Sequence, residues 1–365
     1  MTEPLELSVV IPTCCRAATL CRTLDTVLRQ DYDLTRAEII VVCDGPDPET
    51  RALIAELSHD ARCALRLIEQ PRQGQGRARN RGIEAALGRV VVMLDDDIAA
   101  APGLLAAHMR HHGERDDAVV TGALPLAPWP EEAAHRRMVR EWWDDELREM
   151  ASRSHRATFR DFVTGNVSVA RARLADVGGF EPAFTGYGRE DYELGFRLQQ
   201  AGLRFIYEPS AVGVHYYEKS PLEWLRQFRS MGRADVKFAR KHPASVDEVM
   251  ALSPFPRWPG VAHAIPWLER FVLACNDRGG RAWAIAAALT QGAHYWEGVE
   301  SEVRDPRELA WLIAARTRVR EALARAERAR RGEGRLRRVL RRVTGWRPGG
   351  LGRVLARALG RSPLS

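Results

Sequence analysis

An apolar run that ends abruptly in three acids most constrains what this chain can fold into. Val90–Leu94 is apolar throughout, and Asp95, Asp96 and Asp97 follow it without a break. A Val-rich run of this kind is typical of a strand that is buried on both faces. Because ionised carboxylates are costly to bury unpaired, the strand must end at the acids. The pattern therefore predicts a sheet edge that carries carboxylates, which is where open α/β folds bind ligands.

The three acids also predict a metal site. Crowded carboxylates repel one another, and a hard divalent cation with oxygen ligands relieves that repulsion. On an extended backbone Asp95 and Asp97 point to one side of the strand and Asp96 points to the other. The first two are therefore candidates for facing a ligand, and Asp96 is a candidate for bracing the turn. A solvated acidic turn is the alternative, and the flanking sequence decides between the two.

Strand and helix patterns alternate along the first hundred residues. The order predicts right-handed βαβ units and a mostly parallel, Rossmann-like central sheet flanked by helices. After residue 100 the strands become shorter and two long helices are expected, at 131–150 and 221–242. We predict an α/β domain over residues 1–242, with a nucleotide-binding half at 1–100 and an acceptor half at 101–242, then a helical extension at 243–334 and an Arg-rich tail at 335–365.

The net charge of +7 is concentrated in this tail. Residues 335–365 contain nine arginines and no acid, and removing those nine charges leaves −2 for residues 1–334. Apolar residues recur at helical spacing among the arginines, at Leu336, Val339, Leu340 and Val343. This basic amphipathic pattern is typical of docking on an anionic membrane surface. A solvated, partner-docked or disordered tail is the alternative, and no nucleic acid is expected as a partner, because basic residues alone bind it only non-specifically.

Three further features bear on the compartment. The six cysteines show no CxxC pair and no disulfide-framework spacing, which predicts reduced thiols in a cytoplasmic protein. The acidic start, Met1–Glu6, runs directly into a strand pattern, so no signal peptide is expected. The uncharged stretch Ala282–Trp296 is shorter than the roughly 20 residues that a spanning helix needs. We therefore expect a cytoplasmic protein whose only membrane contact is peripheral, at the inner face of the cell membrane.

Seven short motifs then follow one another in a familiar order. They are Val9–Thr13, Val41–Gly45, Gly74–Gly82, Leu94–Asp97, Gly165-Asn166, Gly186–Asp191 and His215. Together they resemble the inverting glycosyltransferases of family 2, which have the GT-A fold and carry a DxD motif. The resemblance covers about residues 7–242. It implies that a sugar moves from a nucleoside-diphosphate sugar to a hydroxyl acceptor such as a glycan or a lipid-linked saccharide.

The donor diphosphate needs a metal bridge, and the acids after the fourth strand suit it. Asp97 lies at an exposed strand end, and Asp95 is placed toward the ribose or the metal. The resemblance implies that His215 completes the coordination of Mn²⁺ or Mg²⁺, and an imidazole can ligate Mn²⁺. The alternative for His215 is a hydrogen bond to backbone at a strand end.

The rest of the donor site is expected at the ends of the first two strands and near a Gly loop. Asp44 can accept a hydrogen bond from a uracil-type N–H, which favours a UDP-sugar; a plain Asp-Gly turn is the alternative. Cys43 stands where the family usually has a second acid, so Asp44 is the only candidate there. Further donor contacts are expected from Pro12, Thr13, Arg16, Arg72, Arg79, Asn80 and Asp96, with a solvated helix face as the alternative for each arginine.

Asp191 is the best candidate for the catalytic base. Inverting transfer needs a group that removes the proton of the acceptor hydroxyl as its oxygen attacks the anomeric carbon. The resemblance assigns this role to the second acid of Glu190-Asp191, with Glu190 in support. Acids in a first helical turn also serve as caps favoured by the helix dipole, and the two uses are compatible.

The acceptor site is expected to involve Gly165, Asn166, Tyr187 and Trp142. Gly165-Asn166 lies between two short strands and would shape the pocket. Trp142 can stack on a sugar ring, and core packing of Trp142-Trp143 is the alternative. Two other functions compete with glycosyl transfer. A sugar nucleotidyltransferase would leave Glu190-Asp191 unexplained, and a non-catalytic membrane-surface protein would not need both acid clusters.

Overall fold

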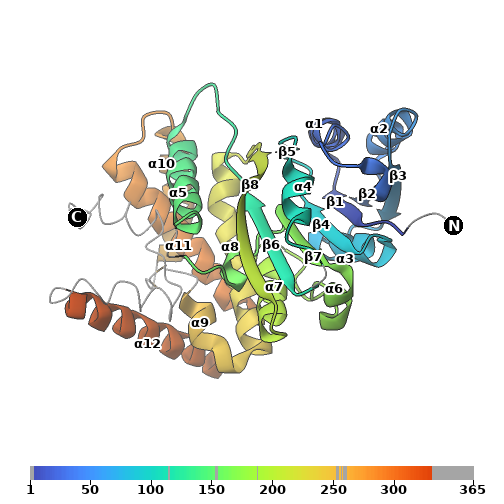
Figure 1. Ribbon diagram of the computed structural model, residues 1–365. Helices are drawn as coiled ribbons and strands as arrows, with labels where there is room; N and C mark the ends of the chain where they lie inside the picture. The colour runs from blue at the N-terminus through green and yellow to red at the C-terminus, as the bar shows by residue number, and fades with distance from the viewer. Residues whose placement is uncertain are drawn as a thin grey trace. The chain divides into compact units, whose positions relative to one another are not determined.

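A computed structural model describes residues 4–113, 116–152, 155–186, 188–251, 255, 257 and 261–330 (Figure 1). The chain forms two compact units. The α/β unit comprises residues 1–128, 147–186 and 190–217, and the helical unit comprises 129–146, 187–189 and the chain from 218 onward. These units do not follow the predicted domain boundaries, which stay a prediction, because residues 218–242 group with the helical unit. The Arg-rich tail at 335–365 lies outside the described residues.

The α/β unit is built on an eight-stranded sheet in the order β3-β2-β1-β4-β7-β6-β8-β5 (Figure 1). Its strands are β1 (Leu7–Thr13), β2 (Ala37–Asp44), β3 (Ala64–Gln70), β4 (Val90–Leu94), β5 (Ile98–Ala100), β6 (Ala118–Ala123), β7 (Asn166–Ala170) and β8 (Arg204–His215). The pairs β1–β2, β1–β4 and β2–β3 are parallel, whereas β7 runs antiparallel to β4 and to β6. Strands β1 to β4 therefore have the predicted parallel order among themselves, and antiparallel pairing enters with β5 and β7.

Six helices of the α/β unit accompany this sheet in the described residues. They are α1 (Ala17–Val27), α2 (Pro48–Ser58), α3 (Gln75–Ala85), α4 (Leu104–Met109), α6 (Arg171–Val177) and α7 (Glu190–Gln200). Helix α3 lies close to the sheet because Gly82 has no side chain: a Cβ there would lie 2.3 Å from Val10 Cγ1. Ala78 is fully buried one turn earlier. This close packing fixes the position of Arg79, which is 1% exposed.

The core of the α/β unit explains why the fourth strand ends where it does. All five residues of β4 are buried, and so are all residues of β1 and β2. Val91 and Met93 pack in one cluster with Val10, Ile40 and Phe162. A charged group inside such a layer is costly unless it is paired, as Glu38 of β2 is with Ser8 and Arg66. The acids therefore follow the strand at the carboxyl edge of the sheet, as predicted.

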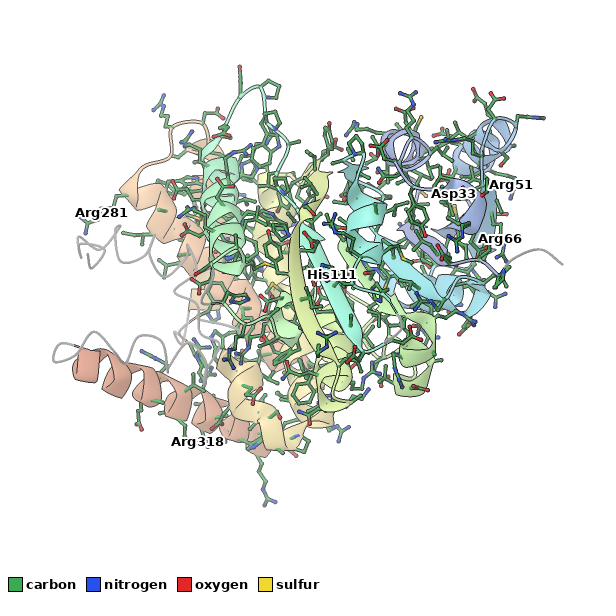
Figure 2. The ribbon with its side chains drawn as sticks, in the orientation of Figure 1. Asp33, Arg51, Arg66, His111, Arg281 and Arg318 are labelled. Carbon is green, nitrogen blue, oxygen red and sulfur yellow. The ribbon has the colours of Figure 1, made fainter. Side chains whose placement is uncertain are left out.

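The helical unit consists mainly of α8 (Pro221–Lys241), α9 (Val246–Ala251), α10 (Ile265–Ala274), α11 (Arg281–Glu302) and α12 (Pro306–Arg330). Helices α8 and α11 approach closely at glycines: a Cβ on Gly232 would lie 2.0 Å from the Tyr295 carbonyl oxygen. Arg318 of α12 pairs with Asp247 of α9 at 2.6 Å (Figure 2). Among the described helices, none is both long and apolar enough to cross a membrane.

Candidate active site

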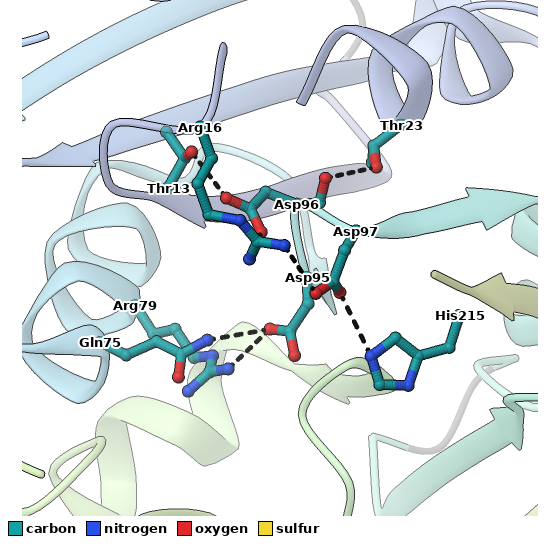
Figure 3. A network of polar contacts seen from close by, with 9 residues as sticks. All are labelled: Thr13, Arg16, Thr23, Gln75, Arg79, Asp95, Asp96, Asp97 and His215. Atoms are coloured by element: carbon teal, nitrogen blue, oxygen red, sulfur yellow. Dashed lines mark hydrogen bonds and ion pairs between the residues drawn. The ribbon is translucent and has the colours of Figure 1, made fainter. Parts of the chain in front are cut away.

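The three acids of the opening motif lie at the carboxyl edge of the sheet, beside the end of β1 (Figure 3). Asp96 turns away from its two neighbours and is 5% exposed. It accepts hydrogen bonds from the Thr13 hydroxyl and from Arg16 Nη1, both at 2.7 Å. Burial raises the pKa of Asp96 to about 7, although the charge of Arg16 and the Thr13 hydrogen bond oppose that shift. Its contacts are those of a brace between the loop after β1 and the turn after β4.

Asp97 lies on the opposite side, against Arg16 and His215 (Figure 3). Arg16 Nη2 donates to Asp97 Oδ2 at 3.0 Å, and Asp97 Oδ1 lies 3.6 Å from His215 Nε2. Burial alone would raise the pKa of Asp97, but the hydrogen bond and charge of His215, together with Arg16, hold it below its usual value. Strand pairing explains the encounter, because Ile98 of β5 is the register partner of His215 at the end of β8.

Asp95 is held by α3. Arg79 Nη2 donates to Asp95 Oδ1 at 2.7 Å, and Gln75 Nε2 donates to the same oxygen at 3.2 Å (Figure 3). Arg79 Nη1 lies 3.9 Å from Glu190 Oε1, so one buried guanidinium stands between the two acid clusters. Arg79 also lies over the Phe180 ring, 5.5 Å from its centroid. Asp95 and Glu190 are thus separated by the Arg79 side chain alone.

The two acids at the start of α7 differ in exposure. Glu190 is 7% exposed, and burial together with the neighbouring Asp191 charge raises its pKa to about 7 against the charge of Arg79. Asp191 is only partly buried, and its Oδ1 accepts a hydrogen bond from the Tyr192 backbone at 2.8 Å. The geometry therefore leaves Asp191 as the more accessible acid of the pair. Tyr187 lies outside the described residues.

Asp44 organises the loop that follows β3. Its Oδ1 accepts from Gln70 Nε2 and from the Gln73 backbone, and its Oδ2 accepts from the Gly74 backbone, at 2.7–2.8 Å. Gly74 has a φ of +98°, a backbone conformation that favours glycine, so the loop is built on this residue. Base recognition by Asp44 stays a prediction, because the carboxylate already holds three donors and is 7% exposed.

Two other predicted donor residues have contacts of their own. The Asn80 amide makes a pair of hydrogen bonds with the Phe180 backbone, at 2.7 and 2.8 Å, and so ties α3 to the segment before α7. Arg72 is exposed, and its Nη2 lies 3.0 Å from Cys14 Sγ. Pro12 is fully buried within β1. Donor contact by these three residues stays a prediction.

Asn166 lies in a buried network of hydrogen bonds. Its side chain is 0% exposed, and its amide nitrogen donates to the Ala123 and Ala211 carbonyls while its oxygen lies 2.8 Å from His108 Nε2. Its amide N–H groups are thus engaged within the fold, and a role in shaping the acceptor pocket stays a prediction. Gly165 lies against the donor acids, because its carbonyl accepts from the Asp95 backbone at 3.3 Å.

The partner of Asn166 belongs to a buried chain of polar groups that the sequence analysis missed. His108 Nδ1 lies 2.9 Å from Ser168 Oγ, which lies 2.8 Å from His112 Nε2. Because an amide oxygen only accepts, His108 carries its proton on Nε2, and Ser168 donates to Nδ1 while accepting from His112. Burial lowers the pKa of both histidines to about 4. The four-residue spacing between His108, on α4, and His112, three residues after that helix ends, was the available signal.

Trp142 is 40% exposed and packs edge-on against Trp143, with ring centroids 5.4 Å apart. Both residues lie in α5 (Ala134–Met150), within the part of that helix that belongs to the helical unit. The exposure argues against core packing for Trp142. Its contact with an acceptor stays a prediction.

A cation fits Asp97 and His215 better than the predicted trio. No group of three or more His, Cys, Asp or Glu side chains converges on a metal position within the described residues. Asp95 is turned to Arg79, whereas Asp97 Oδ1 is buried and faces the imidazole of His215, whose Nε2 lies 3.6 Å away. Two protein ligands would suffice if oxygen atoms of the substrate supplied the remaining ligands, because hard cations are coordinated by phosphate and water oxygens.

The mixed α/β sheet flanked by helices defines the fold as one of the GT-A class. A family model described as glycosyl transferase family 2 matches residues 8–173, and one described as the N-terminal domain of galactosyltransferase matches residues 147–219. The chain belongs to glycosyltransferase family 2. The family and the fold that were predicted from the sequence are thereby confirmed.

Individual relatives agree with this assignment. The chain is 33% identical over 271 residues to validoxylamine A glucosyltransferase of Streptomyces hygroscopicus subsp. jinggangensis, which covers 67% of this chain and 62% of that protein. It is 29% identical over 248 residues to the pre-mycofactocin glycosyltransferase of Mycobacterium tuberculosis, with 65% and 48% covered. The match thus spans less than two thirds of either relative.

A solved structure with the same fold is the mannosyltransferase PcManGT from Pyrobaculum calidifontis. The TM-score is 0.51 at 19% identity, with 99% of this chain and 88% of that chain covered. At this identity the likeness concerns the fold alone.

Proposed function

We propose that the chain is a metal-dependent inverting glycosyltransferase that moves a sugar from a nucleoside-diphosphate sugar, foremost a UDP-sugar, to a hydroxyl acceptor. The observation that carries the proposal is the position of Arg79. Its guanidinium lies 2.7 Å from Asp95 and 3.9 Å from Glu190, so the acids suited to a leaving diphosphate and the acids suited to a base flank one cation. Direct displacement needs both ends in a single site.

The leaving-group end is assigned to the residues after β4. Asp97 and His215 would hold Mn²⁺ or Mg²⁺, and Asp95 would face the ribose or the metal. When bound, the cation supplies Lewis-acid stabilisation of the charge that develops on the nucleoside diphosphate. PcManGT is described in complex with GDP-Man and Mn²⁺, which supports a metal and a sugar nucleotide here. Arg16, which pairs with Asp96 and Asp97, is placed to meet the same phosphates.

The role of catalytic base is assigned to Asp191. Its carboxylate takes the proton of the acceptor hydroxyl while that oxygen bonds to the anomeric carbon and the bond to the diphosphate breaks. Glu190 is more buried, and the burial that raises its pKa to about 7 disfavours its charged form. It therefore supports the geometry of the site while Asp191 acts as the base.

The acceptor is proposed to be a glycan, a lipid-linked saccharide or another hydroxyl compound. The names of the two relatives, a validoxylamine A glucosyltransferase and a pre-mycofactocin glycosyltransferase, widen the choice to small hydroxylated molecules. Peripheral contact with an anionic membrane through residues 335–365 is part of the proposal, and it rests on the charge pattern of the sequence.

A thermal-shift screen tests the proposal directly. The purified chain is mixed with UDP-, GDP- and dTDP-sugars, each with Mn²⁺ and with EDTA. A recognised donor stabilises the fold by mass action, so one nucleotide family should raise the melting temperature with Mn²⁺. Release of the corresponding nucleoside diphosphate then establishes turnover. No stabilisation and no release with any sugar nucleotide would contradict the proposal.

A further inference from the structure

Gly188 and Arg189 belong to the helical unit, although the chain on either side of the segment 187–189 belongs to the α/β unit. Glu190 and Asp191 come directly after this excursion and open α7. The excursion is held by specific contacts within the helical unit. A Cβ on Gly188 would lie 3.0 Å from Met231 Cγ of α8, so the backbone passes close to that helix.

Arg189 is the main attachment of this segment. Its Nε donates to Asp235 Oδ1 of α8 at 2.6 Å, and the two side chains are 7% and 0% exposed. The second oxygen of Asp235 accepts from the Tyr295 hydroxyl of α11 at 2.8 Å. A buried, charge-assisted pair of this kind has strict geometry, because removing either partner leaves an uncompensated buried charge.

The backbone of Arg189 shows that this attachment determines its conformation. Its φ is +70°, in the left-handed region that a residue with a side chain rarely adopts. Gly188 before it has a φ of +100°. Such a conformation persists only where the surroundings over-determine it, and the ion pair with Asp235 supplies that constraint. The backbone conformation immediately before Glu190, the first residue of α7, is therefore constrained.

The close crossing of α8 and α11 makes the attachment rigid. A Cβ on Gly298 would lie 2.0 Å from the Arg229 carbonyl oxygen, so the two helix backbones touch at Gly298 and at Gly232, both contacts lying within two turns of Asp235 on α8. Asp235 thus stands on a scaffold that has little freedom to move.

We propose that Asp235, oriented by Tyr295, is a positioning residue for the reaction: through Arg189 it fixes the backbone immediately before Glu190 and thereby holds the Asp191 carboxylate at the start of α7. This inference rests on the proposed function, in which Asp191 is the base. Small displacements of a base from its reacting proton are costly in rate, on the order of 100-fold for about 1 Å.

The test compares Asp235→Asn with Glu308→Gln. The second variant weakens another ion pair of α8, in which Arg240 Nε donates to Glu308 Oε1 at 2.9 Å, and it leaves Arg189 alone. Tyr295→Phe removes one hydrogen bond to Asp235 and serves if Asp235→Asn does not fold. UDP release from UDP-glucose with Mn²⁺ gives kcat and KM per folded molecule, and hydrogen–deuterium exchange reports on residues 188–193.

Asp235→Asn should lower kcat on the order of 10- to 100-fold with KM for UDP-glucose changed less than about twofold, and should speed exchange at the start of α7. Tyr295→Phe should do the same to a smaller extent, and Glu308→Gln should lower only the melting temperature. If Asp235→Asn and Tyr295→Phe lower the melting temperature alone, with kcat and exchange unchanged, the positioning role is refuted. If the wild-type chain releases no nucleotide from any sugar nucleotide, the proposed function fails. Independently of that result, unchanged exchange of residues 188–193 in Asp235→Asn would refute the anchoring of this segment.

Discussion

His215 Nε2 lies 3.6 Å from Asp97 Oδ1 because Ile98, the residue after Asp97, is the antiparallel register partner of His215. The Tyr216 backbone also donates to the Asp97 carbonyl at 2.9 Å. The two side chains are therefore brought together by main-chain pairing of β5 with β8, and their encounter does not depend on a ligand. A pre-formed pair of this kind limits the ordering cost of binding a cation.

Asp97→Ala should weaken the binding of Mn²⁺ and of the nucleotide together, because the same carboxylate would hold the cation that bridges to the diphosphate. Titration calorimetry with UDP should show an affinity loss of tenfold or more with Mn²⁺, on the order of 1.4 kcal/mol, and little change with EDTA. Asp60→Ala, at an exposed loop position, is the matched control. If the wild-type chain binds the nucleotide equally well with Mn²⁺ and with EDTA, the metal assignment is contradicted.

Asp191→Asn should abolish transfer and leave donor binding nearly intact. The amide keeps the shape of the side chain but cannot take a proton, and general-base catalysis is worth about 10²–10⁴ in rate. Single-turnover release of nucleoside diphosphate measures the loss, and calorimetry with the intact donor measures binding. Asp176→Asn, on an exposed turn of α6, should behave as the wild-type chain does. Undiminished turnover in Asp191→Asn would remove Asp191 from the role of base.

Asn166→Ala should destabilise the fold and leave donor affinity unchanged. The substitution strands the buried Ala123 and Ala211 carbonyls and His108, and each unsatisfied buried group costs about 1–3 kcal/mol. Urea unfolding should show a loss of about 3 kcal/mol or more. A variant of unchanged stability would contradict this role of Asn166 in the fold.

Because two histidines are buried, we expect the free energy of unfolding to fall in mild acid. Burial lowers the pKa of His108 and of His112 to about 4 in the folded chain, against the ordinary value of 6.5 for histidine. Between these values the unfolded chain binds more protons, so stability is complete above pH 6.5 and is lost as the pH falls toward 4. Each histidine contributes a slope of up to about 1.4 kcal/mol per pH unit. His112→Gln should reduce the slope measured by urea unfolding between pH 7 and pH 5, and an identical slope would refute the assignment.

Deletion of residues 335–365 should reduce sedimentation with anionic liposomes and spare the hydrolysis of donor sugar. Nine arginines leave with the segment, and basic residues near an anionic surface contribute about 1 kcal/mol each. Neutral liposomes provide the control. Equal sedimentation of the full and shortened chains would refute membrane contact through the tail.

The sequence by itself determined the sheet and the position of its acids. Hydrophobic periodicity is local, so the end of β4 at Leu94, the strand–helix alternation before it and the order of the motifs were all readable along the chain. Strand geometry also separated Asp96 from its two neighbours, and in the structure Asp96 does contact Thr13 and Arg16.

Only the tertiary structure decided which of these residues meet and which are used by the fold. Asp95 contacts Arg79 because α3 packs on the sheet at Gly82. The Asn166 side chain forms a hydrogen bond with the buried His108, and Arg189 forms an ion pair with Asp235, which is distant in sequence. Such pairings depend on burial and on strand and helix contacts between distant segments. Local patterns do not encode them, because a side chain's partners are fixed only when the packed layers come together.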